Sequence, residues 1–445
     1  MTLTTEQTTR EQWNTFRSAL NEDDGIGVLK AFRDRLICDG SFNRAFNIDP
    51  EMTLKSEYSI LSISDICIFI PQQLQEKLGW DGEKSDRAEL LKKTLDLDRL
   101  QRERIKQLQL VHAGWDVWRQ KQITRYQNED RSPRGVQITH IPFAIELTQG
   151  CSGACSFCGL SAPQLSDKGS DARDLGAAFE RLLKELHKHS GALGEYGVLY
   201  WASDPLDHRQ YETYAELFAK EFGVWPGTTT ALAETQLERV IQIIHSDAME
   251  RPWGLRCSMR SASAYRQLCQ GLTVNERALL RLLPQYRQSG SVQALAGRAY
   301  QPEAIDRQLE AGGSIACMSG LLISLPQNEI SLITPCRAEP LNRNGYRTLA
   351  STQAATSDEL ADAAKRILIN LPCPVISPGQ LLRVNIDRSQ YSLYCSQEFP
   401  DLLSRLEEQP MSLVELCRQL SPASSPQELI GYCVTLLQVG AVRSV

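Results

Sequence analysis

The sequence lacks long apolar runs and an excess of basic residues. No stretch is apolar enough to span a bilayer, and the first residues lack the apolar core of a signal peptide. We therefore expect a cytoplasmic protein without a membrane partner. The 48 lysines and arginines stand against 54 aspartates and glutamates, which gives a formal net charge of −6. General nucleic-acid binding favours basic patches, so no nucleic-acid partner is expected.

Paired cysteine motifs are also missing from most of the chain. The count of 13 cysteines is odd, and without a secretory signal it argues against a disulfide framework. Ten of the cysteines form no C-x2-C or C-x3-C pair, so a second metal cluster has no signature, and most are interpreted as small buried hydrophobic residues. These ten are Cys38, Cys67, Cys257, Cys269, Cys317, Cys336, Cys373, Cys395, Cys417 and Cys433.

The remaining three cysteines form the most informative motif in the chain. Cys151, Cys155 and Cys158 have C-x3-C-x2-C spacing and follow an apolar run over 142–147 that predicts a strand. Small residues at 152–154 allow the backbone to fold tightly around a ligand. Three thiolates in one compact loop suit an iron–sulfur cluster. On a four-iron cluster they leave one iron without a protein ligand, as in catalytic metal sites.

The motif has two other interpretations. A zinc ion requires a fourth ligand nearby, but the next histidine is His187 and the next cysteine is Cys257. A chance group of buried cysteines is the second alternative. Three cysteines within eight residues at this spacing favour the 4Fe–4S cluster over both.

With an aromatic residue, Phe157, before its third cysteine, the motif resembles the signature of radical S-adenosylmethionine (SAM) enzymes. The resemblance implies that SAM binds the open iron through its amino and carboxylate groups. It also implies an electron donor such as flavodoxin or ferredoxin, and cleavage of SAM to a 5′-deoxyadenosyl radical. Phe157 is assigned to cofactor binding. The motif does not indicate the substrate.

Expected strands and helices alternate from about residue 138, which implies parallel strands with helical crossovers. This α/β pattern fits the partial (β/α) barrel of radical SAM enzymes. We expect a helical N-terminal domain over 1–135, the barrel over 136–350, and a linker helix with a winged-helix-like module over 351–445. Strands are expected at 142–147, 197–201, 226–232 and 253–259, and helices at 8–21, 26–38, 87–125 with a break near Gly114, 172–189, 208–222, 235–246 and 274–289. The segment 54–70 fits either a buried helix or an irregular stretch.

Polar residues follow two of the expected strands, where chemistry in such barrels is found. Ser203 and Asp204 follow the second strand, at which the family holds the SAM amino group with a glycine- and glutamate-containing turn. The resemblance assigns Asp204 to the SAM ammonium; a capping turn is the alternative. Ser258 and Arg260 end the fourth strand and are assigned to the ribose and the SAM carboxylate, because arginine binds carboxylates through two donors. A surface ion pair is the alternative for Arg260.

Residues 313–347 narrow the substrate class. Two apolar runs flank a turn at 326–328 and predict a hairpin, and Cys336 follows the second run. This pattern and the chain length resemble the proteusin-type peptide epimerases, which are isomerases that act on ribosomally made precursor peptides. The resemblance implies that the radical removes an α-hydrogen and that a cysteine thiol returns hydrogen from the opposite face. A strand end places Cys336 near the barrel mouth as the expected donor. Cys317 and Cys373 are the alternatives, and an inert buried thiol is open for each.

The last part of the chain predicts a winged-helix-like module. Strands are expected at 381–386 and 391–395, and helices at 399–407, 412–420 and 426–437. The pattern is similar to leader-peptide recognition domains, which bind a precursor peptide as an added strand. A DNA-binding winged helix has the same pattern, but the segment 402–445 has few basic residues. Peptide cross-linking, C-methylation and an iron–sulfur sensor are the competing functions.

Overall fold

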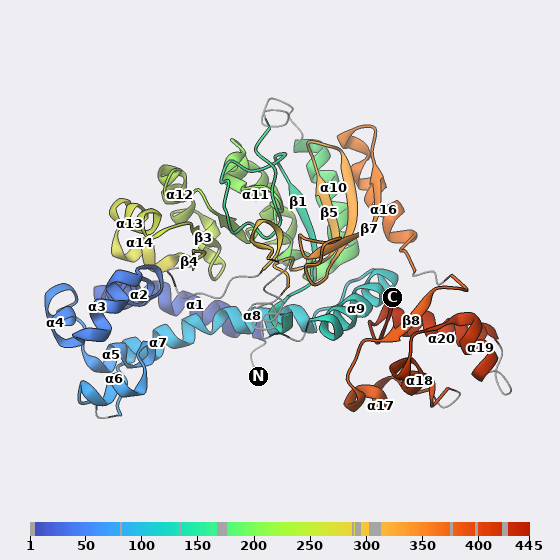
Figure 1. Ribbon diagram of the computed structural model, residues 1–445. Helices are drawn as coiled ribbons and strands as arrows, with labels where there is room; N and C mark the ends of the chain where they lie inside the picture. Colours follow the sequence, from blue (N-terminus) through green and yellow to red (C-terminus); the bar gives the residue numbers. More distant parts are fainter. Residues whose placement is uncertain are drawn as a thin grey trace.

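The computed structural model describes residues 5–80, 82–130, 132, 135–166, 176–286, 289, 295–301, 313–373, 377–396, 399–420 and 426–445. The fold is mixed α/β, with many helices and three small sheets (Figure 1). In Figure 1 the helices of residues 24–95 and the C-terminal module lie at opposite ends of the molecule, with the other two sheets between them. None of the described helices is long and apolar enough to cross a bilayer.

The N-terminal part is helical, as predicted. Many of its apolar side chains form a core that also includes Trp253 and Ala278, whereas Trp115 and Trp118 pack in the main core. The helix expected over 87–125 is three helices, because the chain breaks at Asp96 and again over 108–112. Gly114 lies in the first turn of the last helix, which His112 caps by accepting from Trp115 N–H (3.1 Å). The helices are α1 (Thr5–Glu22), α2 (Asp24–Cys38), α3 (Gly40–Ile48), α4 (Pro50–Glu57), α5 (Ile63–Ile66), α6 (Gln72–Lys77), α7 (Asp86–Leu95), α8 (Leu97–Gln107) and α9 (Ala113–Glu129). The segment 54–70 contains the end of α4, α5 and the 3-10 turn Cys67–Phe69.

Two sheets form the centre of the molecule. The first has the order β1-β5-β6-β7, in which β5 is parallel to β1 while β6 and β7 are antiparallel to their neighbours. The second has the order β2-β3-β4 and is parallel throughout. The strand expected at 197–201 is only a parallel bridge between Val198 and Ala144. The strands are β1 (Ile141–Glu146), β2 (Thr228–Thr230), β3 (Leu255–Met259), β4 (Arg281–Pro284), β5 (Met318–Ser324), β6 (Glu329–Pro335) and β7 (Tyr346–Gln353).

One face of these strands carries the main apolar core. Phe143 and Ile145 of β1, and Leu147 directly after it, alternate along the chain and pack in this core with the covering helices. Ala144 and Glu146 lie between them and face the other way. We call this second face the inner face. The covering helices are α10 (Gly176–Ser190), α11 (Tyr211–Phe222), α12 (Leu237–Ile244), α13 (Ala262–Gly271) and α16 (Leu360–Ile369).

One element of this region differs in type from the prediction. The helix expected over 274–289 ends at Leu279 as α14 (Val274–Leu279), and β4 follows at once. A capping box at Thr273 begins the helix. Parallel pairing with β3 and burial of Leu282 in the main core hold the next residues extended. Tertiary contacts therefore override the local helical pattern.

The C-terminal module, from residue 377 onward, has a separate apolar core. Its sheet has the order β10-β8-β9. The strand expected at 391–395 is wrong, because Tyr391–Tyr394 form a short helix, α17. Upstream, the expected boundary at 350 falls inside β7, and α16 packs in the main core. The module contains β8 (Leu381–Val384), α18 (Leu402–Glu408), β9 (Met411–Ser412), α19 (Leu413–Leu420), α20 (Pro426–Gln438) and β10 (Val442–Ser444).

Candidate functional site

The three motif cysteines lie in a tight loop after β1, residues 147–166, which we call the cysteine loop. Its two ends are tied together, because Cys151 N–H donates to Pro163 O (2.9 Å) and Leu165 N–H donates to Cys151 O (3.3 Å). Gly150 adopts φ +87°, and a Cβ there would lie 2.4 Å from Gln164 O. Only glycine fits this position, so the sequence itself fixes the close approach of the two ends.

Backbone amides point at two of the three sulfurs. Gly153 N–H donates to Cys151 Sγ (3.2 Å), and Ala162 N–H donates to Cys158 Sγ (3.4 Å). A Cβ at Gly153 would lie 3.2 Å from Cys151 Sγ and 3.5 Å from Cys155 Sγ, so two sulfurs meet beside this glycine. Burial raises the pKa of Cys151 to about 12 and that of Cys155 to about 11. Metal binding would have to displace these protons, because the thiolate is the ligand.

Side chains from other elements brace the loop. Arg298 donates from its backbone N–H to Cys158 O (2.9 Å) and from its guanidinium to Cys155 O (3.0 Å). Asp207 accepts from Ser152 N–H (2.8 Å) and from the Ser152 hydroxyl (2.5 Å). The cysteine loop is therefore held by two residues that lie far after it in the sequence.

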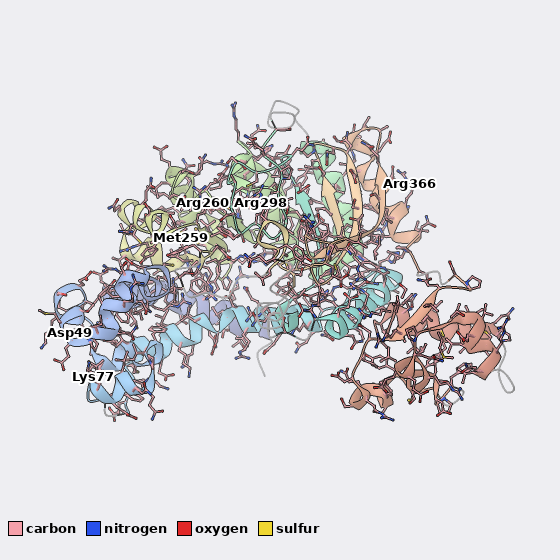
Figure 2. The ribbon with its side chains drawn as sticks, in the orientation of Figure 1. Asp49, Lys77, Met259, Arg260, Arg298 and Arg366 are labelled. Carbon is pink, nitrogen blue, oxygen red and sulfur yellow. The ribbon has the colours of Figure 1, made fainter. Side chains whose placement is uncertain are left out.

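Arg260 is a third brace and not a free cation. It donates to Gly153 O (3.1 Å) and pairs with Glu234, whose side chain is only 4% exposed. Figure 2 labels Arg260, which follows β3, and Arg298, the two arginines that donate to the cysteine loop. The ion-pair alternative for Arg260 is therefore present in the structure, although the carboxylate of the pair is buried.

The carboxylate of Asp204 is likewise occupied by protein donors. It accepts from Thr230 Oγ1 (2.8 Å), Ala231 N–H (2.6 Å) and Leu206 N–H (3.0 Å). Burial, opposed by these hydrogen bonds, raises its pKa to about 6. The hydrogen bond from Leu206 N–H is the capping turn that was the alternative for Asp204. The bonds from Thr230 and Ala231 join the loop after Val198 to β2 and the loop that follows it.

The other sequence-predicted cofactor residues are less constrained. Ser258 lies at an inner-face position of β3, because its neighbours Cys257 and Met259 are in the main core. Ser203 Oγ accepts from Trp201 N–H at 3.5 Å. Phe157 is partly buried within the cysteine loop. The structure brings Ser258 to the inner face and keeps Ser203 and Phe157 on the loops beside it.

The inner face contains polar groups that the sequence analysis missed. Arg256 donates to the Tyr200 hydroxyl (2.9 Å), which donates to Thr229 Oγ1 (2.8 Å). Glu146 accepts from Ala202 N–H (2.8 Å), and burial raises its pKa to about 7. Alternation was the signal that could have found them, because Glu146 and Arg256 stand between core residues on β1 and β3.

Cys336 does not lie at the mouth that we expected. It follows β6, which is antiparallel to β5, and β5 is parallel to β1. The end of β6 is therefore level with the beginning of β1, whereas the cysteine loop follows the end of β1. That part of the prediction is wrong because the second strand of the predicted hairpin runs opposite to β1, so its end does not lie at the edge where β1 ends. The Cys336 thiol is fully buried beside Arg347 and Glu129, and burial raises its pKa to about 12.

Three structural features bear on the choice among the donor candidates. The loop that follows Cys336 reaches the cysteine loop, because Gly297 N–H donates to Arg343 O (2.6 Å) and the next residue, Arg298, binds Cys158. Cys317 packs with the apolar cluster of the inner face. Cys373 is exposed, and its sulfur accepts from Gln438 Nε2 (2.7 Å).

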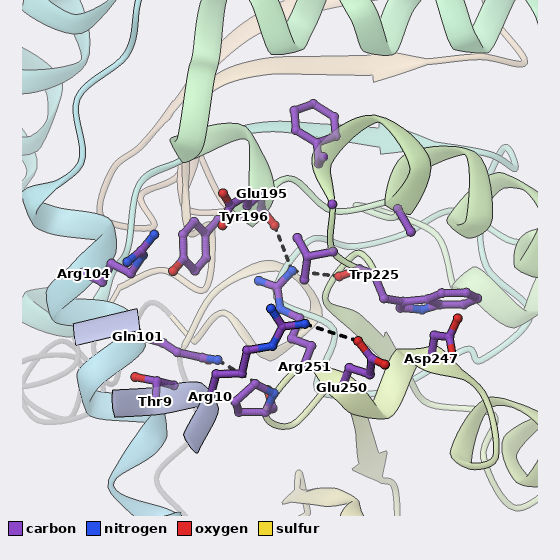
Figure 3. Close-up of a pocket in the computed structure, with 15 residues that line it drawn as sticks. Thr9, Arg10, Gln101, Arg104, Glu195, Tyr196, Trp225, Asp247, Glu250 and Arg251 are labelled. Carbon is purple, nitrogen blue, oxygen red and sulfur yellow. Dashed lines mark hydrogen bonds and ion pairs between the residues drawn. The ribbon is translucent and has the colours of Figure 1, made fainter. Parts of the chain in front are cut away.

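A separate cavity of about 330 Å³ lies between α1, α8 and the loops that lead into Val198, β2 and β3 (Figure 3). Arg251 joins two of these loops by donating to Glu195 O (2.8 Å) and Trp225 O (2.9 Å). These loops precede their strands, whereas the cysteine loop follows β1. The cavity is therefore at a different edge and is not part of the candidate site.

Within the described residues, no three histidine, cysteine, aspartate or glutamate side chains converge on a point that one metal ion could occupy. A four-iron cluster takes each cysteine on a different iron. The finding therefore concerns a single bound ion such as zinc.

Comparison with known proteins gives little functional information. No protein-family model matches the chain, and no solved structure matches it. A curated protein from Sinorhizobium fredii (strain NBRC 101917 / NGR234), "Uncharacterized protein y4wI", is 27% identical over 274 residues. The match covers 59% of this chain, and the chain spans about half the length of that relative (52%).

Proposed function

We propose that this protein is a radical SAM enzyme that converts L-residues to D-residues in a ribosomally made precursor peptide. The observation that carries the proposal is the cysteine loop. Three cysteines lie in a loop whose backbone amides point at two of the sulfurs and whose glycine leaves room beside two of them. Backbone donors around sulfur ligands are among the features that tune iron–sulfur clusters.

The chain's own residues fit a cluster at this position. Cys151, Cys155 and Cys158 would each hold one iron, and Arg298, Asp207 and Arg260 would keep the loop in place. When bound, the cluster and SAM supply a carbon radical that removes a hydrogen atom. We infer that the two central sheets belong to one partial (β/α) barrel and that SAM binds on its inner face, near Ser258, Ser203 and Phe157. In this proposal Asp204 and Arg260 do not contact SAM. They hold the surrounding loops in place.

A thiol must then return hydrogen to the opposite face of the peptide α-carbon. Cys336 remains our proposed donor, because its following loop reaches the cysteine loop through Gly297 and Arg298. Cys317 is the alternative that the packing of the inner face favours. The C-terminal module is proposed to bind the leader of the precursor, and flavodoxin or ferredoxin to supply the electron.

Reaction of a precursor peptide in D2O tests the proposal directly. The reconstituted protein, SAM and a reductant should add one deuterium to each converted residue, because the exchangeable thiol supplies the new hydrogen. Chiral analysis of the hydrolysed peptide should find D-residues at the labelled positions. Cross-linked or methylated product without deuterium would support the competing peptide modifications. Absence of SAM cleavage would instead favour an iron–sulfur sensor.

A further inference from the structure

The cavity of Figure 3, about 330 Å³ in volume, lies where helices α1 and α8 meet the loops that lead into Val198, β2 and β3. Its volume is within the range of small-molecule sites, roughly 300–1,000 Å³. Val198 forms a parallel bridge with Ala144 of β1, so the loop that leads into Val198 is level with the beginning of β1. The cysteine loop follows the end of β1. A ligand in this cavity would therefore be separate from the proposed chemistry.

The guanidinium of Arg251, which lines this cavity, is only partly satisfied by the protein. Its Nη1 donates to Glu195 O (2.8 Å) and Trp225 O (2.9 Å), as the dashed lines in Figure 3 show. Among the described residues, no acceptor binds its Nε or Nη2 and no carboxylate forms an ion pair with it. Burial lowers the pKa of Arg251, so a bound anion would stabilise its charged form.

Two other arginines show what the edge formed by Nε and Nη2 binds in this chain. Arg239 donates to two backbone carbonyls, and its Nε and Nη2 also donate to the two carboxylate oxygens of Glu212 (2.9 and 2.8 Å). Arg87 directs the same edge to Asp23 (2.5 and 2.8 Å). This edge fits the two oxygens of a carboxylate. Arg251 has two carbonyl contacts, like Arg239, but lacks the carboxylate, so a ligand carboxylate would complete the arrangement.

Aromatic side chains surround the guanidinium on the cavity wall. Arg251 Cζ lies 5.3 Å from the centre of the Tyr196 ring. Phe222 and Trp225 line the cavity with only 6% of each residue exposed, and Val224 lies between them in the sequence and lines it too. This wall suits a flat apolar group attached to the carboxylate, because ligand pockets combine apolar walls with a few polar groups that fix orientation.

The remaining charges of the wall favour a ligand with a single negative charge. Glu195, Asp247 and Glu250 line the cavity, and so do Arg10 and Arg104. Arg10 pairs with Glu250 (3.4 Å), and both side chains are exposed at the rim. A dianion such as phosphate would bring its second charge among three carboxylates, and like charges are unfavourable at a binding surface.

We propose that this cavity binds a small carboxylate with an aromatic body, held by the Nε and Nη2 edge of Arg251. The ring of the ligand packs against Tyr196 and the apolar wall. Such a ligand would join α1 and α8 to the loops that lead into the strands, and it would stabilise this junction because it binds only the folded chain. The site does not depend on the proposed function, so failure of either leaves the other standing.

Calorimetry of the full-length protein with 3-phenylpropionate tests this inference. The amide 3-phenylpropionamide has the same shape but no charge and should bind at least about tenfold more weakly. Arg251→Lys keeps the positive charge but removes the planar fork, so 3-phenylpropionate should also bind at least about tenfold more weakly. Arg239→Lys changes a comparable arginine outside the cavity and should bind normally. Equal binding of the acid and the amide, or by the parent and Arg251→Lys, would overturn the assignment of Arg251.

A cavity-filling variant keeps the test decisive if Arg251→Lys loosens the loops. Ala219 of α11 lines the cavity and is partly exposed, so Ala219→Phe would occupy cavity space without changing Arg251. We expect 3-phenylpropionate to bind this variant at least about tenfold more weakly, whereas Ala219→Ser, the matched control, should bind normally. Circular dichroism checks that the variants are folded. Unchanged binding by Ala219→Phe, or no binding to the parent at millimolar concentration, would overturn the proposal.

Discussion

Arg260, at the end of β3, donates a hydrogen bond to the carbonyl oxygen of Gly153, between Cys151 and Cys155 (3.1 Å). The same guanidinium is paired with Glu234, so its position is fixed on both sides. Arg260, at the end of a strand of the β2-β3-β4 sheet, thereby supports the cysteine loop, which follows β1 of the other central sheet. A brace of this kind affects a bound cluster through the loop and needs no contact with SAM.

Replacement of Arg260 by alanine should lower cluster retention without unfolding the protein. The loop loses one hydrogen bond at Gly153, and Glu234 loses its partner. We expect the iron content of the reconstituted protein to fall by about tenfold, the lower end of the range for supporting residues of metal sites. Iron and sulfide analysis measures this. Arg87→Ala breaks a comparable ion pair with Asp23 in the N-terminal part and should leave the iron content unchanged. Normal retention in Arg260→Ala would show that the brace is dispensable.

Replacement of Cys151, Cys155 and Cys158 together by alanine should abolish cluster binding and 5′-deoxyadenosine formation. The three thiols are the proposed iron ligands, and alanine offers no ligand atom. Absorption spectra and product analysis by chromatography provide the measurement. Cys433→Ala, in the separate core of the C-terminal module, is the matched control and should keep both properties. SAM cleavage near the normal rate by the triple variant would refute the assignment.

The sequence predicted those parts of the fold that depend on local pattern. The hairpin of β5 and β6, β3 and the amphipathic helix α10 were found because their apolar periodicity is strong. The segment that became β4 was misread as helix, since only its pairing with β3 makes it a strand. The missed strand β7 has exposed and half-buried residues and little apolar signal. Its position depends on pairing with β6 along its whole length.

The candidate site was predictable only where chemistry is local in the sequence. The three cysteines stand within one loop, and their spacing alone indicates a shared ligand. Asp204 and Arg260 were identified by position, but the sequence does not show that other protein groups already occupy them. Cys336 was placed at the wrong level because the direction of β6 relative to β1 depends on which strands pair. Such pairing joins residues far apart in the chain, which periodicity cannot reveal.

Replacement of Glu146 by glutamine should change how stability depends on pH. Burial raises the pKa of Glu146 to about 7, whereas an unfolded glutamate titrates near about 4.3. Between these values the folded chain holds a proton that the unfolded chain releases. The free energy of unfolding therefore falls as the pH rises through this window and is lowest above it. Glutamine still accepts from Ala202 N–H and carries no charge.

The Glu146→Gln variant should thus be more stable than the parent protein at about pH 8, by about 3 to 4 kcal/mol, and nearly equal at about pH 4. Urea denaturation at several pH values gives the comparison. Glu339→Gln, at an exposed position in the loop after β6, should leave the pH profile unchanged. A parallel shift of Glu146→Gln at every pH would mean that the pKa of this carboxyl is not raised.

Removal of the C-terminal module from residue 377 should weaken binding of the precursor peptide by at least about tenfold while the iron content persists. The module has a core of its own, and strand addition supplies affinity through main-chain hydrogen bonds. Anisotropy of a labelled precursor measures the affinity, and circular dichroism checks that the rest is folded. Unchanged affinity in a folded truncation would place leader binding in the N-terminal helices instead.

Replacement of Cys336 by alanine should separate radical formation from epimerisation. The buried thiol is replaced by a smaller apolar group, which costs stability by about 1 kcal/mol, so the fold should survive. The first hydrogen transfer does not involve Cys336, and 5′-deoxyadenosine should still form. The second transfer lacks its donor, so D-residues should fall at least about a hundredfold. Chromatography of the nucleoside and chiral analysis of the peptide give the two readouts.

Parallel variants decide which thiol is the donor. Cys317→Ala changes the alternative on the inner face, and Cys373→Ala changes the exposed cysteine near Gln438. If Cys336 is the donor, both should still make D-residues that contain deuterium from D2O. If only Cys317→Ala forms 5′-deoxyadenosine without D-residues, Cys317 is the donor, in line with its packing on the inner face. The assignment to Cys336 is then wrong. Deuterium-labelled D-residues from Cys336→Ala would exclude it in the same way, because a thiol that has been removed cannot deliver the hydrogen.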